Sequence, residues 1–120
     1  MSKKTKNDNQ FKGDAITRET PIDSNGEVII PADFCKQAGL ELGSEVWVID
    51  DEKRAIVITN DCSGYKDCEM ERCLLDKSGI VKLPSRYLNR FEISDKQEIT
   101  ILLPHTRDEV VIETFKSVFR

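Results

Sequence analysis

Long hydrophobic runs are missing from this sequence of 120 residues. No apolar stretch approaches the roughly 18 residues that cross a bilayer, and no apolar core follows the basic N-terminal end as it would in a signal peptide. Phosphate-binding glycine loops and His-Glu zinc motifs are missing too. The single histidine, His105, lies in an expected turn without a nearby nucleophile. We therefore expect a cytoplasmic protein with no membrane contact, no cofactor, no bound metal and no enzymatic activity.

The four cysteines only partly follow the spacing of a typical metal site. Cys62, Cys68 and Cys73 are separated by five and then four residues, whereas zinc-binding pairs usually have about two to four residues between them. Cys35 lies on the apolar side of an expected helix. We expect reduced and partly buried thiols, and the sequence leaves open a redox or metal role for Cys62, Cys68 and Cys73.

Charge is unevenly distributed along the chain, whose formal net charge is -4. Residues 1–14 carry a net charge of +2, residues 15–59 carry -5, residues 60–73 carry -2 and residues 74–120 carry +1. A polyanion would therefore meet the N-terminal tail or the second half more favourably than the acidic first half.

One pattern occurs twice, 53 positions apart. Residues 22–31 (IDSNGEVIIP) return as residues 75–84 (LDKSGIVKLP), with aspartate, glycine, valine and proline at the same places. Two copies are too few for a solenoid, which needs about three. Each copy of roughly 45 residues is also near the size at which a single core becomes marginal. We therefore expect the two halves to share one core.

Each copy predicts the same order of elements: strand, turn, strand, helix and hairpin, or ββαββ. A proline opens each helix, since the N–H that proline lacks would have no partner in the first helical turn. The expected strands are 15–22, 27–30, 45–49 and 54–59 in the first copy and 69–75, 80–83, 98–103 and 109–113 in the second. The fold class expected from these elements is mainly β with short helices.

The two helices are expected to end differently. The first, about two and a half turns long after Pro31, stops at Gly39, a natural C-terminal cap. Glu92 stands at the matching place after the second helix. We therefore expect the second helix to end without a left-handed residue.

Four further side chains are assigned to the interior or to solvent. Trp47 and Tyr87 are expected in the core, where aromatic side chains are more common than on base-stacking surfaces. Asp50 and Asp51 are expected in the solvated turn of the first hairpin.

The expected elements divide the chain into five segments. These are a disordered basic tail (1–13), the first repeat (14–60), a cysteine-containing linker (61–68), the second repeat (69–113) and a C-terminal tail (114–120). In the C-terminal tail, Phe115, Val118 and Phe119 are expected to dock on the body as one helical turn.

The first copy resembles the AbrB-like (SpoVT–AbrB/MazE) swapped-hairpin family. The residues that carry this resemblance are Asp23, Gly26, Val28, Ile30, Pro31, Phe34, Gly39, Leu40, Gly43, Glu45, Val46, Trp47 and Val48. It covers residues 15–59 and, through the repeat, residues 69–113. The resemblance implies a swapped-hairpin β-barrel built from the two ββαββ repeats. Two copies in one chain resemble MraZ-type proteins, although the Asp-x-x-x-Arg signature of that subgroup is absent here.

The resemblance also implies a DNA-binding transcriptional regulator that contacts mainly backbone phosphates. At the positions where the family has its DNA-facing arginines, this chain has Glu27, Ile80, Cys35, Lys36, Leu88 and Asn89. The candidate DNA-binding residues are therefore the cations that remain nearby: Arg18, Lys36, Lys77, Lys82, Arg86 and Arg90. Arg86 and Arg90 stand one helical turn apart and can share a face.

The missing arginines leave a second function open, that of an antitoxin-type or non-DNA-binding protein-interaction or assembly module with the same fold. Glu27 would repel phosphate, which favours a structural or protein-binding role for the first repeat. The expected partners are accordingly DNA, further copies in a homodimer or higher oligomer, and a toxin or regulatory protein. The sequence does not decide whether the repeats pair within one chain or across two.

Overall fold

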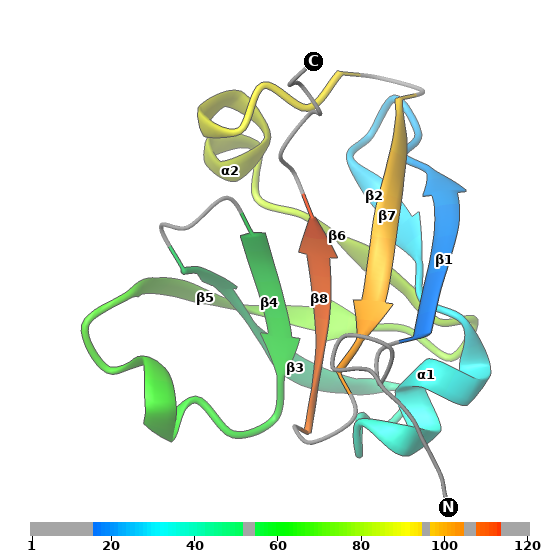
Figure 1. The fold of residues 1–120 in the computed structure, drawn as a ribbon, viewed down its shortest axis with the longest axis vertical. Helices are drawn as coiled ribbons and strands as arrows, with labels where there is room; N and C mark the ends of the chain where they lie inside the picture. The colour runs from blue at the N-terminus through cyan, green and yellow to red at the C-terminus, as the bar shows by residue number, and fades with distance from the viewer. Residues whose placement is uncertain (1–15, 52–54, 95–96, 105–107, 114–120) are drawn as a thin grey trace, which may run out of the picture.

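Antiparallel strands dominate the described part of the chain, residues 16–51, 55–94, 97–104 and 108–113 of a computed structural model. Eight strands form a nearly closed barrel with two short helices (Figure 1). In chain order the elements are β1 (Ile16–Pro21), β2 (Glu27–Ile29), α1 (Ala32–Gln37), β3 (Ser44–Asp50), β4 (Ala55–Thr59), the 3-10 turn η2 (Ser63–Tyr65), β5 (Glu69–Leu75), β6 (Ile80–Lys82), α2 (Ser85–Arg90), β7 (Glu98–Leu103) and β8 (Glu109–Glu113). The expected fold class, mainly β with short helices, is confirmed. Both predicted tails and the turn of His105 lie outside the described residues.

The strands follow one another around the barrel in the order β1-β7-β8-β4-β3-β5-β6-β2. The pairs β1–β7, β3–β5, β2–β6 and β4–β8 each join one repeat to the other. The β1–β7 and β5–β3 pairs have the same register once the 53-residue shift is applied. Pro21 lies opposite Glu98, and the matching residue Leu74 lies opposite the matching residue Glu45. β1 and β2 are the two ends of the sheet, so the barrel is open between them.

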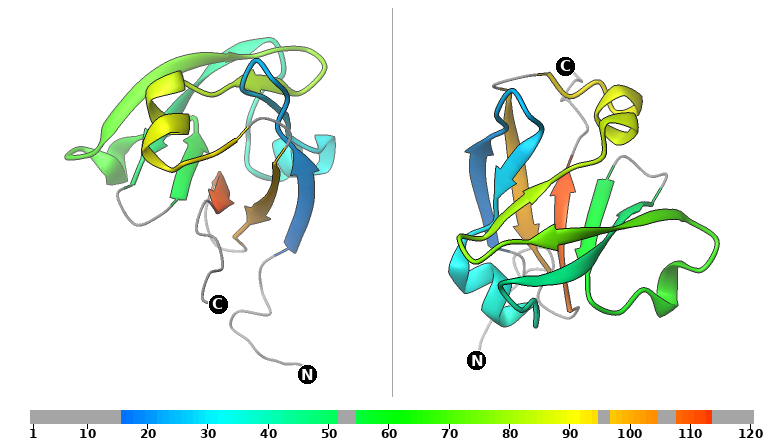
Figure 2. Two further views of the ribbon diagram at one scale, coloured as in Figure 1. Left: turned by 90° about the horizontal axis from the view of Figure 1, so that it is seen from above. Right: turned by 180° about the vertical axis from the view of Figure 1, so that it is seen from behind.

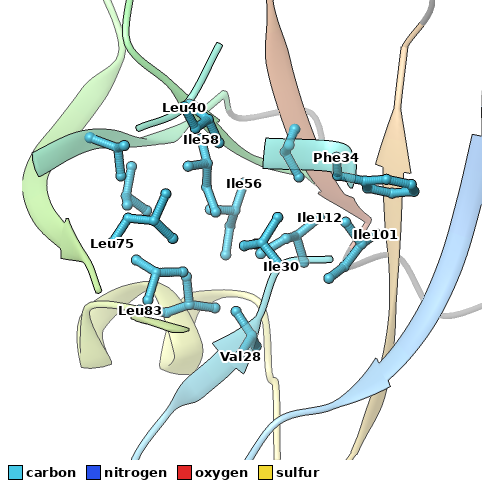
Figure 3. Packing of buried hydrophobic residues seen from close by; sticks show 14 of the residues in the cluster. Val28, Ile30, Phe34, Leu40, Ile56, Ile58, Leu75, Leu83, Ile101 and Ile112 are labelled. Atoms are coloured by element: carbon cyan, nitrogen blue, oxygen red, sulfur yellow. The ribbon is translucent and has the colours of Figure 1, made fainter. Parts of the chain in front are cut away.

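A single hydrophobic core lies inside the barrel and draws on both repeats (Figure 3). Val28, Ile30 and Phe34 from the first repeat are buried together with Leu83 and Ile101 from the second. Burying one such side chain stabilises the fold by about 1.5–3 kcal/mol. The expectation that the two halves share one core is confirmed.

Both helices begin directly after a proline, as the sequence predicts. Pro31 has φ -55° and Pro84 has φ -58°, values that proline favours and that lead into a helix. Each helix is six residues long, so the first is shorter than the predicted two and a half turns. Tyr87 on α2 and Phe34 on α1 face the core from matching places.

The expected difference between the two helix ends is wrong. Gly39 has φ 73° and Glu92 has φ 58°, so both are left-handed. The backbone hydrogen bonds explain this, because Leu40 N donates to the Cys35 carbonyl and Ile93 N donates to the Leu88 carbonyl, each at 2.8 Å. The same chain reversal is imposed on both halves, and Glu92 adopts it despite its Cβ.

The two helices lie on opposite sides of the barrel (Figure 2). Within the described ranges, no helix combines the length and the apolar composition that crossing a bilayer requires.

Candidate functional site

The six predicted DNA-binding residues are spread over both sides of the molecule. Arg86 and Arg90 project from α2 and both pair with Glu69, as their one-turn spacing allows. Arg18 lies on β1 and Lys36 on α1. The remaining two, Lys77 and Lys82, lie in the turn between β5 and β6 and at the end of β6.

The two arginines on α2 are held by carboxylates of β5 and β3. Arg86 pairs with Glu69 and Glu71, and Arg90 pairs with Asp50 and, at 3.1 Å, with Glu69. The hydrogen bonds from Arg86 and then Arg90 lower the pKa of Glu69 below its usual value. Two guanidinium groups thus meet three carboxylates, and this arginine cluster has no excess of positive charge to offer a phosphate.

Asp50 anchors the arginine cluster to the interior of the barrel. Its side chain is only 1% exposed, so the expectation that it lies in a solvated turn is wrong. Asp50 is the last residue of β3, whose end faces α2, and Arg90 compensates its buried charge. Arg86 also lies over the ring of Tyr87, 4.9 Å from its centroid. The arginines therefore fix α2 on the barrel.

The third predicted arginine is also paired. Arg18 on β1 bonds to Asp33 on α1 at 3.1 Å and lies over the ring of Phe34, 5.2 Å from its centroid. A partner-binding role for Arg18 would have to break this contact.

The three predicted lysines make no ion pair with another residue in the described ranges. Acidic groups nevertheless surround one of them, because Lys82 lies opposite Glu27 in the β2–β6 register. Its charge also adds to the lowered pKa of Asp23, whose first cause is the hydrogen bond from the Glu27 backbone N–H. The aliphatic chain of Lys77 lies over Gly43.

A groove that the sequence did not predict lies where the barrel is open. Its volume is about 390 Å³. The lining residues come from the end of β1, the following turn, β2 and β6, and are Thr20, Pro21, Ile22, Asp23, Ser24, Glu27, Ile29 and Ile80. Ile29 is 55% exposed and lies opposite Ile80 in the strand register. The groove thus combines an apolar surface with two carboxylates.

The matching place in the second repeat has different chemistry. Lys82 stands where the first repeat has Ile29, and Leu74 stands where it has Pro21. One sequence signal could have pointed to the groove. Ile29 stands on a short strand at a place where the other copy has a lysine, which suggests that this place is exposed.

None of the four cysteines lines the groove, whereas the Cys73 thiol lies near enough to Glu71 and Arg86 for their charges to act on its pKa. Cys35 is buried, while Cys62, Cys68 and Cys73 are half-buried and unbridged. Burial raises the pKa of Cys73 to about 11 and also raises that of Cys35. In the ranges that the structure describes, no three potential metal ligands come together.

Trp47, expected in the core, is only half-buried. The Arg72 guanidinium lies over its ring, 5.0 Å from the ring centroid.

Comparison with known proteins gave no match, either to a protein-family model or to a curated protein sequence.

Proposed function

We propose that the chain is a tandem AbrB-like swapped-hairpin protein. The twice-repeated turn motif, the shift-related strand registers and the two proline-initiated helices support this assignment. Asp23 and Asp76, which both copies share, organise their turns in the same way, since each carboxylate accepts two backbone N–H groups at 2.8 to 3.0 Å. The two repeats then complete one barrel within a single, cytoplasmic chain.

The function that this geometry supports best is binding of another protein through the groove between β1 and β2. The observation that carries it is the contrast between the arginine cluster on α2 and the groove. Arg86 and Arg90 are already paired with carboxylates, whereas Ile29 in the groove is exposed. Its volume falls within the range of about 300–1,000 Å³ that is typical of ligand pockets.

The chemistry of the groove specifies its partner. Ile29 and Ile80 would receive an apolar side chain, and Asp23 with Glu27 would attract a neighbouring lysine or arginine. The groove also adjoins the outer edges of β1 and β2, which no strand of the described chain covers. Such edges accept an extended peptide as an added strand. We therefore infer an extended protein segment with an apolar residue next to a basic one.

A peptide array tests this function. The array presents 12-residue peptides that combine aromatic or aliphatic residues with lysine or arginine, together with acidic and scrambled versions. We expect the apolar–basic peptides to bind wild type and to lose binding to Ile29→Lys. Leu74→Lys is the matched control, because Leu74 is equally exposed at 55% but lies outside the groove. Equal binding to both variants would rule out the groove.

DNA binding is the second candidate, and it is favoured by the three lysines that make no ion pair with another described residue. Lys36, Lys77 and Lys82 could make about three phosphate contacts, which corresponds to a salt slope of about -3 in log affinity against log salt. Arg86 and Arg90 could join them only by leaving carboxylates that would then face the phosphate. A net charge of -4 further opposes association.

Fluorescence anisotropy with a labelled duplex of mixed sequence, at two salt concentrations, tests the second candidate. If DNA is the partner, Lys36→Ala/Lys77→Ala/Lys82→Ala should abolish binding, and Arg86→Ala/Arg90→Ala should weaken it less. A loss confined to the arginine variant would assign phosphate contacts to α2 instead. If wild type does not bind at low salt, the DNA function is excluded.

A further inference from the structure

β8, the strand that precedes residues 114–120, ends near the groove. β8 ends at Glu113, which lies opposite Thr100 of β7, and Thr100 lies opposite Glu19 of β1. Neighbouring strands are about 4.8 Å apart, so the end of β8 is about 10 Å from β1. β1 and β8 run in the same direction (Figure 1). β8 therefore points toward the end of the barrel where Pro21 lines the groove.

The segment is long enough to enter the groove. Seven residues span at most about 25 Å when fully extended, more than twice the distance from β8 to β1. The first of these residues follows Glu113 directly, so the attachment holds the segment near the groove at high effective concentration.

The composition of the segment matches that of the groove. Its sequence, TFKSVFR, has three apolar side chains and two cations, namely Phe115, Val118, Phe119, Lys116 and Arg120. The groove offers the complementary pair of surfaces, with isoleucines on β2 and β6 and carboxylates at Asp23 and Glu27. This is the apolar–basic pattern that the proposed function requires of a partner.

The N-terminal segment fits the groove less well. It joins the barrel at Ile16, the far end of β1, about 17 Å along the strand from Pro21. Its four lysines accompany a single aromatic residue, Phe11. An N-terminal occupant would have to run back along β1 to bring that side chain to the groove.

We propose that residues 114–120 occupy the groove of their own chain and that a protein partner binds by displacing them. The proposal rests on the proposed function, because displacement presumes that the partner uses the same groove. Occupancy by the tail shields Ile29 from solvent and from unrelated proteins. It also reduces the apparent affinity of any partner by the fraction of molecules whose groove is open.

Methyl-labelled full-length protein tests the docking by NMR. We expect nuclear Overhauser contacts between the rings of Phe115 or Phe119 and the methyl groups of Ile29 and Ile80. Ile29→Lys should abolish these contacts, and Leu74→Lys should leave them unchanged. Contacts to other methyl groups, or none to the tail, would overturn the proposal.

A sample that mixes labelled with unlabelled chains identifies the source of the tail. Contacts within one chain support the proposal, whereas contacts between chains would replace it with exchange between two copies. Contacts from Phe11 would assign the groove to the N-terminal segment and likewise overturn it.

Affinity measurements separate this proposal from the proposed function. If the tail is docked nine-tenths of the time, Phe115→Ser/Phe119→Ser should bind an array-selected peptide about tenfold more tightly than wild type. Thr114→Ala/Ser117→Ala is the matched control and should bind like wild type. Equal affinities in all three proteins would overturn tail docking while the groove stands as a partner site. Tail contacts by NMR without binding of any array peptide would instead support docking and exclude the proposed function.

Discussion

Arg18 on β1 forms an ion pair with Asp33 on α1, at 3.1 Å between Nη2 and Oδ2. The positions 53 residues later, Glu71 on β5 and Arg86 on α2, form the same strand-to-helix pair with the charges exchanged. In both halves a guanidinium also lies over the aromatic ring of the helix, 5.2 Å and 4.9 Å from the centroids. The contact between strand and helix is thus kept, while the element that carries its positive charge changes.

Exchanging the charges of the first pair should be tolerated. We expect Arg18→Glu to lower the free energy of unfolding by about 1 kcal/mol, because two carboxylates would then meet. Adding Asp33→Arg should restore most of it, since the first repeat would then have the polarity of the second. Urea unfolding of wild type, both single variants and the double variant measures the coupling. A double variant no more stable than Arg18→Glu would contradict the interpretation of the pair as a reversible contact.

Removing the hydroxyl of Tyr87 should stabilise the protein. That hydroxyl is buried and has no hydrogen-bond partner of normal geometry among the described residues. Burial raises the pKa of Tyr87, and the nearby Arg86 opposes this rise. We expect Tyr87→Phe to raise the free energy of unfolding by about 1 kcal/mol. Phe34→Tyr is the matched control, since it places a hydroxyl at the equivalent buried position and should cost about 1–3 kcal/mol. Thermal and urea unfolding measure both, and a clear loss of stability in Tyr87→Phe would indicate a bonded hydroxyl.

The left-handed end of α2 offers a third test. Glu92 has φ 58°, a conformation that suits glycine better than a residue with a Cβ. We expect Glu92→Gly to stabilise the protein by about 0.5–1 kcal/mol. Gly39→Ala, at the matching end of α1, should cost about 1 kcal/mol through its backbone conformation alone, because open space surrounds the new Cβ. If both substitutions were neutral, the two helix ends would have to relax to other conformations in solution.

Alkylation of Cys73 should depend steeply on pH. Burial, then the charge of Glu71, raises the pKa of its thiol from 9.0 to about 11. At pH 8 the thiolate fraction, and with it the rate of reaction with iodoacetamide, should be about 100-fold lower in the folded than in the urea-unfolded chain. Tryptic peptides separate Cys73 from Cys68, since Arg72 lies between them. Equal rates in both states would show that the thiol is solvated.

The same pKa difference predicts how stability responds to alkaline pH. Folding raises the pKa, so the folded chain holds this proton more tightly than the unfolded chain. The contribution of the Cys73 thiol to the free energy of unfolding is therefore fully present below pH 9 and is lost as the pH rises toward 11. Urea unfolding measures this in wild type and Cys73→Ser. The free energies of unfolding of the two proteins should differ more at pH 8 than at pH 10.5.

Local sequence signals predicted the elements well because their causes are local. The turn aspartates bind backbone N–H groups only two and four residues away, and each helix-opening proline acts on its own backbone. The same reasoning failed at Asp50 and Glu92. Asp50 is buried and pairs with Arg90, which is 40 residues away in sequence. Glu92 is left-handed because the chain must reverse there as it does at Gly39.

By itself, the sequence determined the repeat, the order ββαββ, the helix starts and the need for a shared core, since each follows from periodicity, from chain length or from the conformational limits of single residues. Only the tertiary structure decided which charges are paired and where an apolar surface stays open. The partners of Arg86 on α2 lie 15 and 17 residues away on strand β5, so helical spacing cannot reveal them. The groove exists because β1 and β2 are the two ends of the sheet, and the position of an end is set by the pairing of all eight strands.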